Sequence, residues 1–485
     1  MTNHRSRRGC EECRRRRRKC DELKPICGHC NAASRSCRYE LRLVWSDRKA
    51  QHRGLRTTQR RLVQPPPLDS VGQSPALIPD SLPNGVVLPR RYKKLLEYFS
   101  GGVLASLSSH PSIHQDLCQG LIPRMLYSPH LLSASLALSA AGLLSRGLSE
   151  VEGTSISYVL EHLQSSGLSL LRKALTEQRK DEVMVATCLI WCLADVFAGI
   201  QGVPSWRIHL QGIKALLDGH QPDDQLGTGG DNAMESAMRH LFLLYRSLQT
   251  LPYLQTIEPS GPSVDLGQTL FFDSSSALTR SPKIDGFLGY SEELLDLLQH
   301  INSATKKNSG HQFSLNAEAD ILLGKINGMI NRDAKTPPEV SISSTLSPQY
   351  SLDFLLCHQI FQQATLIQLY RQLYTMPSAS QPIQSAVRAI NGMIQNMTQG
   401  QPCNTWVAMA MPLFTVGCEA FDDDQKDFIL DKVQKLEVCI GSLHVHTIKR
   451  ALKDVWKIRT DHQDFEGNIC SSQLLEKLQY NIILF

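Results

Sequence analysis

The chain of 485 residues lacks the short motifs by which many enzymes bind phosphates, hold a catalytic metal or activate a nucleophile. It contains no Gly-x-Ser-x-Gly, no His-Glu-x-x-His, no Gly-x-x-x-x-Gly-Lys-Ser/Thr and no Gly-x-Gly-x-x-Gly. The glycine-rich stretch 227–230 is not followed by Lys-Ser/Thr and predicts only a loop. No His-x-Glu precedes Cys27 and Cys30, which excludes a zinc deaminase site. We therefore predict that the protein is not an enzyme.

Long apolar runs are also missing. The two most apolar stretches are residues 131–144, which three serines interrupt, and residues 183–200, which contain Asp195. Because a membrane-spanning helix needs about 20 consecutive apolar residues, both stretches predict buried helices and no membrane contact. The Arg-rich start is not followed by an apolar segment, so we expect no secretory signal and no disulfide bonds.

Charge is distributed unevenly along the chain. Residues 1–61 hold 19 Lys and Arg against 6 Asp and Glu, a net charge of +13, whereas the remaining residues have a net charge of −8. A basic segment attached to a mildly acidic body predicts that the basic segment binds a polyanion.

Six of the 14 cysteines lie close together near the N-terminus. They form two copies of the unit Cys-x2-Cys-x6-Cys, related by a shift of 17 residues: Cys10, Cys13 and Cys20, then Cys27, Cys30 and Cys37. A Cys-x2-Cys pair followed by a third cysteine is typical of a metal site. The other eight cysteines are scattered through apolar stretches and are expected in the core.

Six thiolates fit two tetrahedral zinc ions only if two of them are shared. Each Zn²⁺ requires four ligands, so the most symmetrical arrangement has Cys10 and Cys27 bridging the two metals. His29, between Cys27 and Cys30, is not needed as a ligand and is expected to be exposed.

This spacing resembles the fungal Zn2Cys6 binuclear-cluster DNA-binding domain. The basic run from Cys13 to Asp21 is similar to the first helix of that family, and Pro25 to the proline that shapes its loop between units. The resemblance implies two Zn²⁺ ions, a helix in the major groove, and a CGG-type triplet read by Arg16 and Arg17. The family usually has Lys at the position of Arg17, and arginine can also pair bidentately with guanine.

Independently of the family, only the first unit carries a basic helix. The candidate DNA-binding residues are Arg14, Arg15, Arg16, Arg17, Arg18 and Lys19. Most of these side chains must contact phosphates, which gives affinity that depends on salt but carries no sequence information.

The composition divides the chain into three parts. Residues 1–40 hold the zinc cluster, residues 41–89 form a linker that is first basic and then rich in proline, and residues 90–485 form an all-α domain. No sustained heptad is present between residues 39 and 65, so no coiled coil is expected after the cluster. Monomeric binding, a homodimer formed through the helical domain, and pairing with another transcription factor all remain open.

The helical part resembles the regulatory domain of fungal zinc-cluster transcription factors, in particular the second, shorter class. The resemblance rests on segments that occur in the family's order: residues 128–132, 206–212, 366–371, 412–420 and 455–456. We interpret Trp206, His209 and Trp456 as packing residues, with His209 hydrogen-bonded inside the bundle. His444 and His446 are expected at the surface or in a helix cap, and residues 422–424 at a helix N-terminus.

Together these features predict a nuclear, sequence-specific transcription factor of RNA polymerase II genes that binds double-stranded DNA through its zinc cluster. The resemblance implies that the helical domain regulates output, in a catabolic or secondary-metabolite gene cluster. The alternative is a DNA-tethered helical scaffold or repressor that needs a partner to select its site.

Overall fold

A computed structural model describes residues 88–177, 182–199, 205–218, 232–251, 283–307, 312–342 and 344–461. It also describes shorter pieces: residues 12–13, 16, 20–21, 27–33 and 37 near the N-terminus, and 464, 467–470, 473–475, 478, 480 and 482–484 near the C-terminus. The chain divides into two compact units, residues 1–77 and 78–485. The described part of the first unit contains the short helix α2 (Gly28–Ala32).

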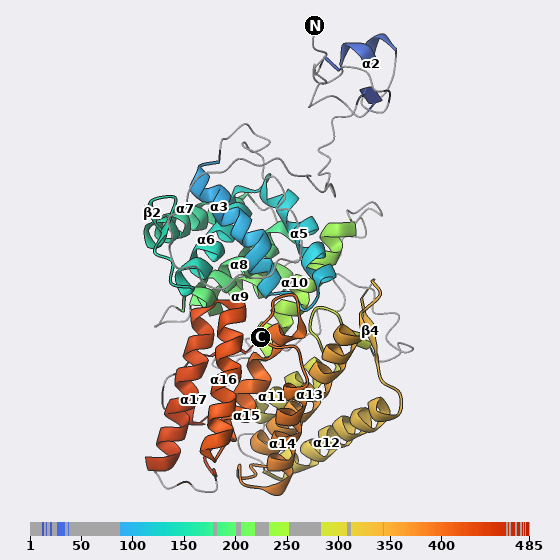
Figure 1. Ribbon diagram of the computed structural model, residues 1–485, viewed down its shortest axis with the longest axis vertical. Helices are drawn as coiled ribbons and strands as arrows, with labels where there is room; N and C mark the ends of the chain where they lie inside the picture. Colours follow the sequence, from blue (N-terminus) through green and yellow to red (C-terminus); the bar gives the residue numbers. More distant parts are fainter. Residues whose placement is uncertain are drawn as a thin grey trace, which may run out of the picture. The chain divides into compact units, whose positions relative to one another are not determined.

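The second unit is built from helices (Figure 1). Its first half contains α3 (Arg90–Tyr98), the π-helical turn η1 (Phe99–Val103), α4 (Leu104–Ser106), α5 (Pro111–Met125), α6 (Pro129–Ser145), α7 (Ile156–Thr176), α8 (Glu182–Ala198), α9 (Ser205–Asp218) and α10 (Asn232–Thr250). Its second half contains α11 (Glu292–Lys307), α12 (Gln312–Lys335), α13 (Pro348–Gln372), α14 (Gln381–Gln395), the 3-10 turn η3 (Thr405–Ala408), α15 (Ala410–Cys418), α16 (Asp423–Ile440) and α17 (Leu443–Asp461).

The two most apolar stretches form α6 and α8, and both helices are buried as predicted. Helix α6 packs against α7 on one side and α8 on another. Gly167 of α7 permits this close approach: a Cβ atom there would lie 2.6 Å from Cζ2 of Trp191 and 2.8 Å from Cβ of Ser133. Within the described residues, no helix is long and apolar enough to cross a membrane.

Strands occupy very little of the described chain. Strand β1 (Glu150–Val151) pairs antiparallel with β2 (Thr154–Ser155), and β3 (Lys283–Asp285) pairs in parallel with β4 (Glu339–Ser341). The predicted fold class is therefore confirmed. The loop predicted over residues 227–230 lies outside the described residues.

Two of the polar sites singled out in the sequence have structural roles, one as a helix cap and one in a contact between helices. Asp422 caps α16, where its Oδ1 accepts a hydrogen bond from the backbone N–H of Gln425 at 2.7 Å, so the predicted helix N-terminus is confirmed. His209 of α9 is only partly exposed, and its Nε2 lies 3.2 Å from Oδ2 of the buried Asp195 in α8. This contact inside the bundle agrees with the packing role expected for His209.

A buried cluster of charged side chains joins α13, α15 and α17. Nε of Arg371 lies 3.3 Å from Oε1 of Glu419, and both side chains are almost completely buried. Ser378 donates to the other oxygen of Glu419, and Arg459 donates to the carbonyl of Cys418 and, at 3.3 Å, to Ser378. The Glu419 carboxylate thus pairs with Arg371, and Ser378 connects it to the buried guanidinium of Arg459.

Three of the family-like segments meet at this cluster. Arg371 ends the segment 366–371 in α13, and Glu419 lies in the segment 412–420. From α17, Trp456 donates through Nε1 to the carbonyl of Gly417 at 2.7 Å. The segments are therefore joined by buried polar contacts as well as by apolar packing.

His444 differs from its predicted position. It is buried rather than at the surface, because the chain near the C-terminus covers it; its Nε2 lies 2.9 Å from the backbone N of Ile483 and 2.5 Å from that residue's carbonyl oxygen. A neutral ring with its proton on Nδ1 accepts from the N–H, whereas a ring with a proton on Nε2 would donate to the carbonyl. Burial outweighs that carbonyl and lowers the pKa of His444 from 6.5 to about 4. His446 is exposed, as expected.

Removing the charge of Glu419 should destabilise the helical unit. In Glu419→Gln the buried guanidinium of Arg371 loses its carboxylate, so we expect the free energy of unfolding to fall by about 3 kcal/mol, measured by urea denaturation with tryptophan fluorescence. Asp423→Asn is the control, because Asp423 is 94% exposed and its ion pair with Lys426 lies at the surface; its effect should stay within about 0.5 kcal/mol. Equal losses in the two variants would contradict the role assigned to Glu419.

Acidification should destabilise the helical unit partly through His444. Below pH 6.5 the unfolded chain binds a proton that the folded chain takes up only near pH 4, so stability is lost as the pH falls through this range. The loss between pH 7 and pH 5 is about 2 kcal/mol. His444→Gln should remove this part of the pH dependence in urea unfolding curves, and His446→Gln should leave it unchanged. Identical pH profiles for the wild type and His444→Gln would refute this assignment.

Candidate metal centre and nucleic-acid interface

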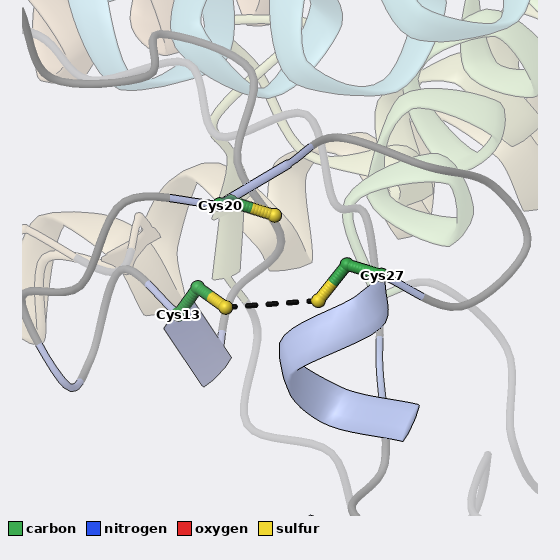
Figure 2. A group of neighbouring side chains, drawn as sticks. All are labelled: Cys13, Cys20 and Cys27. Carbon is green, nitrogen blue, oxygen red and sulfur yellow. Dashed lines mark hydrogen bonds between the residues drawn. The ribbon is translucent and has the colours of Figure 1, made fainter. Parts of the chain in front are cut away.

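The described cysteines of the N-terminal unit converge in two groups of three. The sulfur atoms of Cys13, Cys20 and Cys27 all lie within 4.8 Å of one another, and so do those of Cys27, Cys30 and Cys37. Figure 2 shows the side chains of the first group turned toward one another. Cys27 belongs to both groups, which is the position expected of a bridging ligand.

The backbone around α2 orients these sulfur atoms. Cys27 is the N-cap of α2, and its Sγ accepts a hydrogen bond from the N–H of Cys30 at 3.3 Å. The N–H of Cys27 in turn donates to Sγ of Cys37 at 3.3 Å. Donors directed at sulfur favour the thiolate, which is the form that binds metal.

The distances between the sulfur atoms fit zinc. Sγ of Cys13 lies 3.7 Å from Sγ of Cys27. Two thiolates on one tetrahedral Zn²⁺, each with a bond of about 2.3 Å, lie about 3.8 Å apart. Soft sulfur donors in this geometry are suited to Zn²⁺ and unsuited to Mg²⁺ or Ca²⁺.

Among the described residues between 12 and 37, the buried ones are all cysteines: Cys13, Cys20, Cys27 and Cys30. Cys37 is partly buried. Residues 1–40 hold few apolar side chains besides cysteine, so burial of apolar surface can contribute little to the stability of this segment. Metal binding is then the main source of folding free energy.

A hydrogen bond that was not predicted links the two cysteine units. Asp21 follows the first unit, and its Oδ2 accepts from the backbone N–H of Gly28 at 2.7 Å. A Cβ atom at position 28 would lie 2.6 Å from Oδ2 of Asp21, so a larger residue there would displace this carboxylate. In the sequence, the only hint of this hydrogen bond is that Asp21 directly follows Cys20 and Gly28 directly follows Cys27. No periodic pattern connects the two pairs.

Arg16 is the one candidate DNA-binding residue among those described, and it lies on the surface. Its N–H donates to the carbonyl of Glu12 at 3.1 Å, and its Nε lies 2.9 Å from Oε1 of Glu12. The side chain is 44% exposed, so the guanidinium can leave this pair for another anion. The predicted ligand Cys10, the loop residue Pro25, and the basic residues Arg14, Arg15, Arg17, Arg18 and Lys19 lie outside the described residues. His29 is exposed, as predicted.

The helical unit contains a buried Asp–His pair with the residue types of an acid–base site. Nε2 of His358 lies 3.0 Å from Oδ2 of Asp333, and Gln362 donates to the same oxygen at 2.7 Å. The backbone N–H of Ser291 lies 3.3 Å from Nδ1 of His358. Only 1% of the His358 side chain is exposed and burial lowers its pKa, so this group connects α12 to α13 rather than meeting a substrate.

The contact between Asp21 and Gly28 should control metal affinity. Gly28→Ala displaces Asp21 and loosens the start of α2, so we expect the full chain to bind Zn²⁺ about tenfold more weakly in competition with a chromogenic chelator. His29→Ala is the matched control, because His29 lies in the same short helix with an exposed side chain. Unchanged affinity in Gly28→Ala, or an equal loss in His29→Ala, would contradict this interpretation.

Two family models match the chain. The fungal Zn(2)-Cys(6) binuclear cluster domain matches residues 8–46, and the fungal specific transcription factor domain matches residues 94–485. The first match implies binding of zinc and DNA. The two matches together indicate a transcription factor rather than an enzyme and imply a nuclear location.

Two relatives carry names of regulators. Pestheic acid cluster transcriptional regulator 3 of Pestalotiopsis fici is 22% identical over 590 aligned positions, which cover 99% of each chain. The lysine biosynthesis regulatory protein LYS14 of Saccharomyces cerevisiae is 58% identical over 36 residues, 7% of this chain and 5% of its own length. No solved structure matches the chain significantly. The protein therefore belongs to the fungal zinc-cluster transcription factors, and it is a DNA-binding regulator of transcription.

Proposed function

We propose that the protein is a nuclear transcription factor of RNA polymerase II genes whose cluster of two Zn²⁺ ions positions a basic helix on a CGG-type triplet. The six cysteines from Cys10 to Cys37 hold the metals, with Cys10 and Cys27 as the bridging ligands. The observation that carries this proposal is the place of Cys27 in both groups of three sulfur atoms.

In this proposal Arg16 and Arg17 contact the bases of the triplet. For Arg16, reading a guanine means exchanging its contact with Glu12 for the base. An exposed pair of this kind contributes only about 0.3–0.5 kcal/mol, so the exchange costs little. Arg14, Arg15, Arg18 and Lys19 contact phosphates and supply affinity that depends on salt.

The domain division that we propose is residues 1–40 for the cluster, 41–89 for the linker and 90–485 for the regulatory domain. The family matches at residues 8–46 and 94–485 support it, although the compact helical unit begins earlier, at residue 78. The relative that aligns along nearly the whole chain is named for a cluster, which supports control of a gene cluster by this protein.

Selection from a random DNA library tests the proposal. The zinc-loaded full chain is incubated with random duplexes at about 150 mM salt, where nonspecific phosphate contacts are weakened, and the selection is repeated with chelator. We expect enrichment of one CGG-like triplet, or of two at a fixed spacing, and its loss on chelation. One triplet indicates a monomer and two indicate a dimer. Salt-sensitive binding without enrichment would contradict the proposal and favour a scaffold or repressor that needs a partner.

Single arginine variants separate base reading from phosphate contact. Arg17→Ala should cost about 1–3 kcal/mol on the selected sequence and relax the base preference, whereas Arg15→Ala should weaken binding to all sequences alike. Both are measured by titrating the full chain against the selected duplex and a duplex with one altered triplet. If the two variants change the preference equally, Arg17 is not the base-reading residue.

A further inference from the structure

A cavity of about 340 Å³ lies in the first half of the helical unit, between the start of α3, the connection from α5 to α6, and α7. Its lining is mainly apolar: Leu88, Pro89, Tyr92, Met125, Leu126, Tyr127, Pro129, Leu132, Ser133, Leu136, His162, Leu163 and Ser166. This volume lies within the range of small-molecule sites, which are mostly apolar with a few polar groups.

The cavity exists because α6 and α7 carry small side chains at a point where the two helices are already as close as their backbones allow. Ser133 of α6 and Ser166 of α7 both line it. The hydroxyl of Ser166 donates to the carbonyl of His162 at 2.7 Å, within its own helix. Helices α6 and α7 are already in close contact next to this point, at Gly167. Closer packing cannot fill the space that the serines leave.

Planar side chains are concentrated at this cavity. Tyr92, Tyr127 and His162 are among its lining residues, and the ring of Tyr158 is stacked on that of His162, with centroids 6.5 Å apart and an interplanar angle of 12°. Tyr127 is 67% exposed and Tyr158 is 65% exposed. Exposed rings beside an apolar cavity are suited to stacking against another aromatic ring.

Positive charge lies next to Tyr92, one of the residues that line the cavity. The guanidinium carbon of Arg91 is 5.2 Å from the ring centroid of Tyr92. Arg90, Arg91, Lys93 and Lys94 all belong to the first five residues of α3, whose first turn contains no acidic residue. No Asp or Glu occurs among the described residues that line the cavity. The local field therefore favours an anion over a cation or a neutral molecule.

We propose that this cavity binds a small aromatic carboxylate. The ring lies over the leucines of α6 and against Tyr92 and Tyr127, and the carboxylate pairs with Arg91. At about 30 Å³ for the volume of one water molecule, the cavity has room for on the order of a dozen non-hydrogen atoms. This site lies wholly in the helical unit and goes beyond the DNA-binding function.

The test compares 2-naphthoate with 2-naphthamide, which has the same shape and no charge, by isothermal titration calorimetry with the zinc-loaded full chain and no DNA. We expect naphthoate to bind about tenfold more tightly than the amide, as expected for a charge-assisted hydrogen bond. Arg91→Gln should remove this preference and leave binding of the amide unchanged. Lys94→Gln should retain it, because Lys94 is exposed and paired with Glu97 at 3.2 Å.

A second pair of variants tests the location. Ser166→Phe should fill the cavity and abolish binding of both probes, whereas Ser165→Phe should retain it, because Ser165 lies in the same helix, is exposed and does not line the cavity. Equal thermal unfolding midpoints for the two variants establish that both are folded. The proposal is overturned if neither probe binds the wild type, if the amide binds as tightly as naphthoate, or if Ser166→Phe and Arg91→Gln both bind like the wild type. Since DNA is absent from this assay, its outcome is independent of base reading by the zinc cluster.

Discussion

The sulfur of Cys27 connects the two halves of the cysteine cluster. Residues 1–40 have few apolar side chains besides cysteine, so apolar packing of the kind that stabilises the helical unit can contribute little to the cluster. The N–H of Cys30 directed at Cys27 and the bond from Gly28 to Asp21 orient the same few atoms. Such a unit depends on its metal for its shape, and binding to DNA depends on that shape.

The helical unit is held together differently. Helices α6 and α8 are apolar around most of their circumference and form the centre of the first half, whereas in the second half the buried carboxylate of Glu419 pairs with Arg371 and is linked through Ser378 to Arg459. Such a group requires its partners to be in place, because an unpaired buried charge is costly. Arg371, Glu419 and Arg459 therefore fix the mutual positions of α13, α15 and α17 more narrowly than apolar contacts alone would.

Because metal holds the first unit together and side-chain packing holds the second, DNA binding and regulation have different physical requirements. DNA binding by the first unit requires that its thiolates hold the metal, whereas regulation by the second unit requires a scaffold held together by its own packing. The cavity beside α3 belongs to this scaffold: two serines leave space that tightly packed helices cannot close, and Arg91 brings positive charge to its wall.

Local patterns in the sequence determined much of this protein. The cysteine spacing predicted the metal chemistry, because ligand spacing acts over a few residues. Helical periodicity predicted the all-α unit and the burial of α6 and α8, and residues 422–424 identified a helix start. Only the tertiary structure decided that Arg371 pairs with Glu419, that the chain near Ile483 buries His444, and that Ser133 and Ser166 share one cavity. Each of these joins residues far apart in sequence or on different helices, and no local pattern records which faces meet.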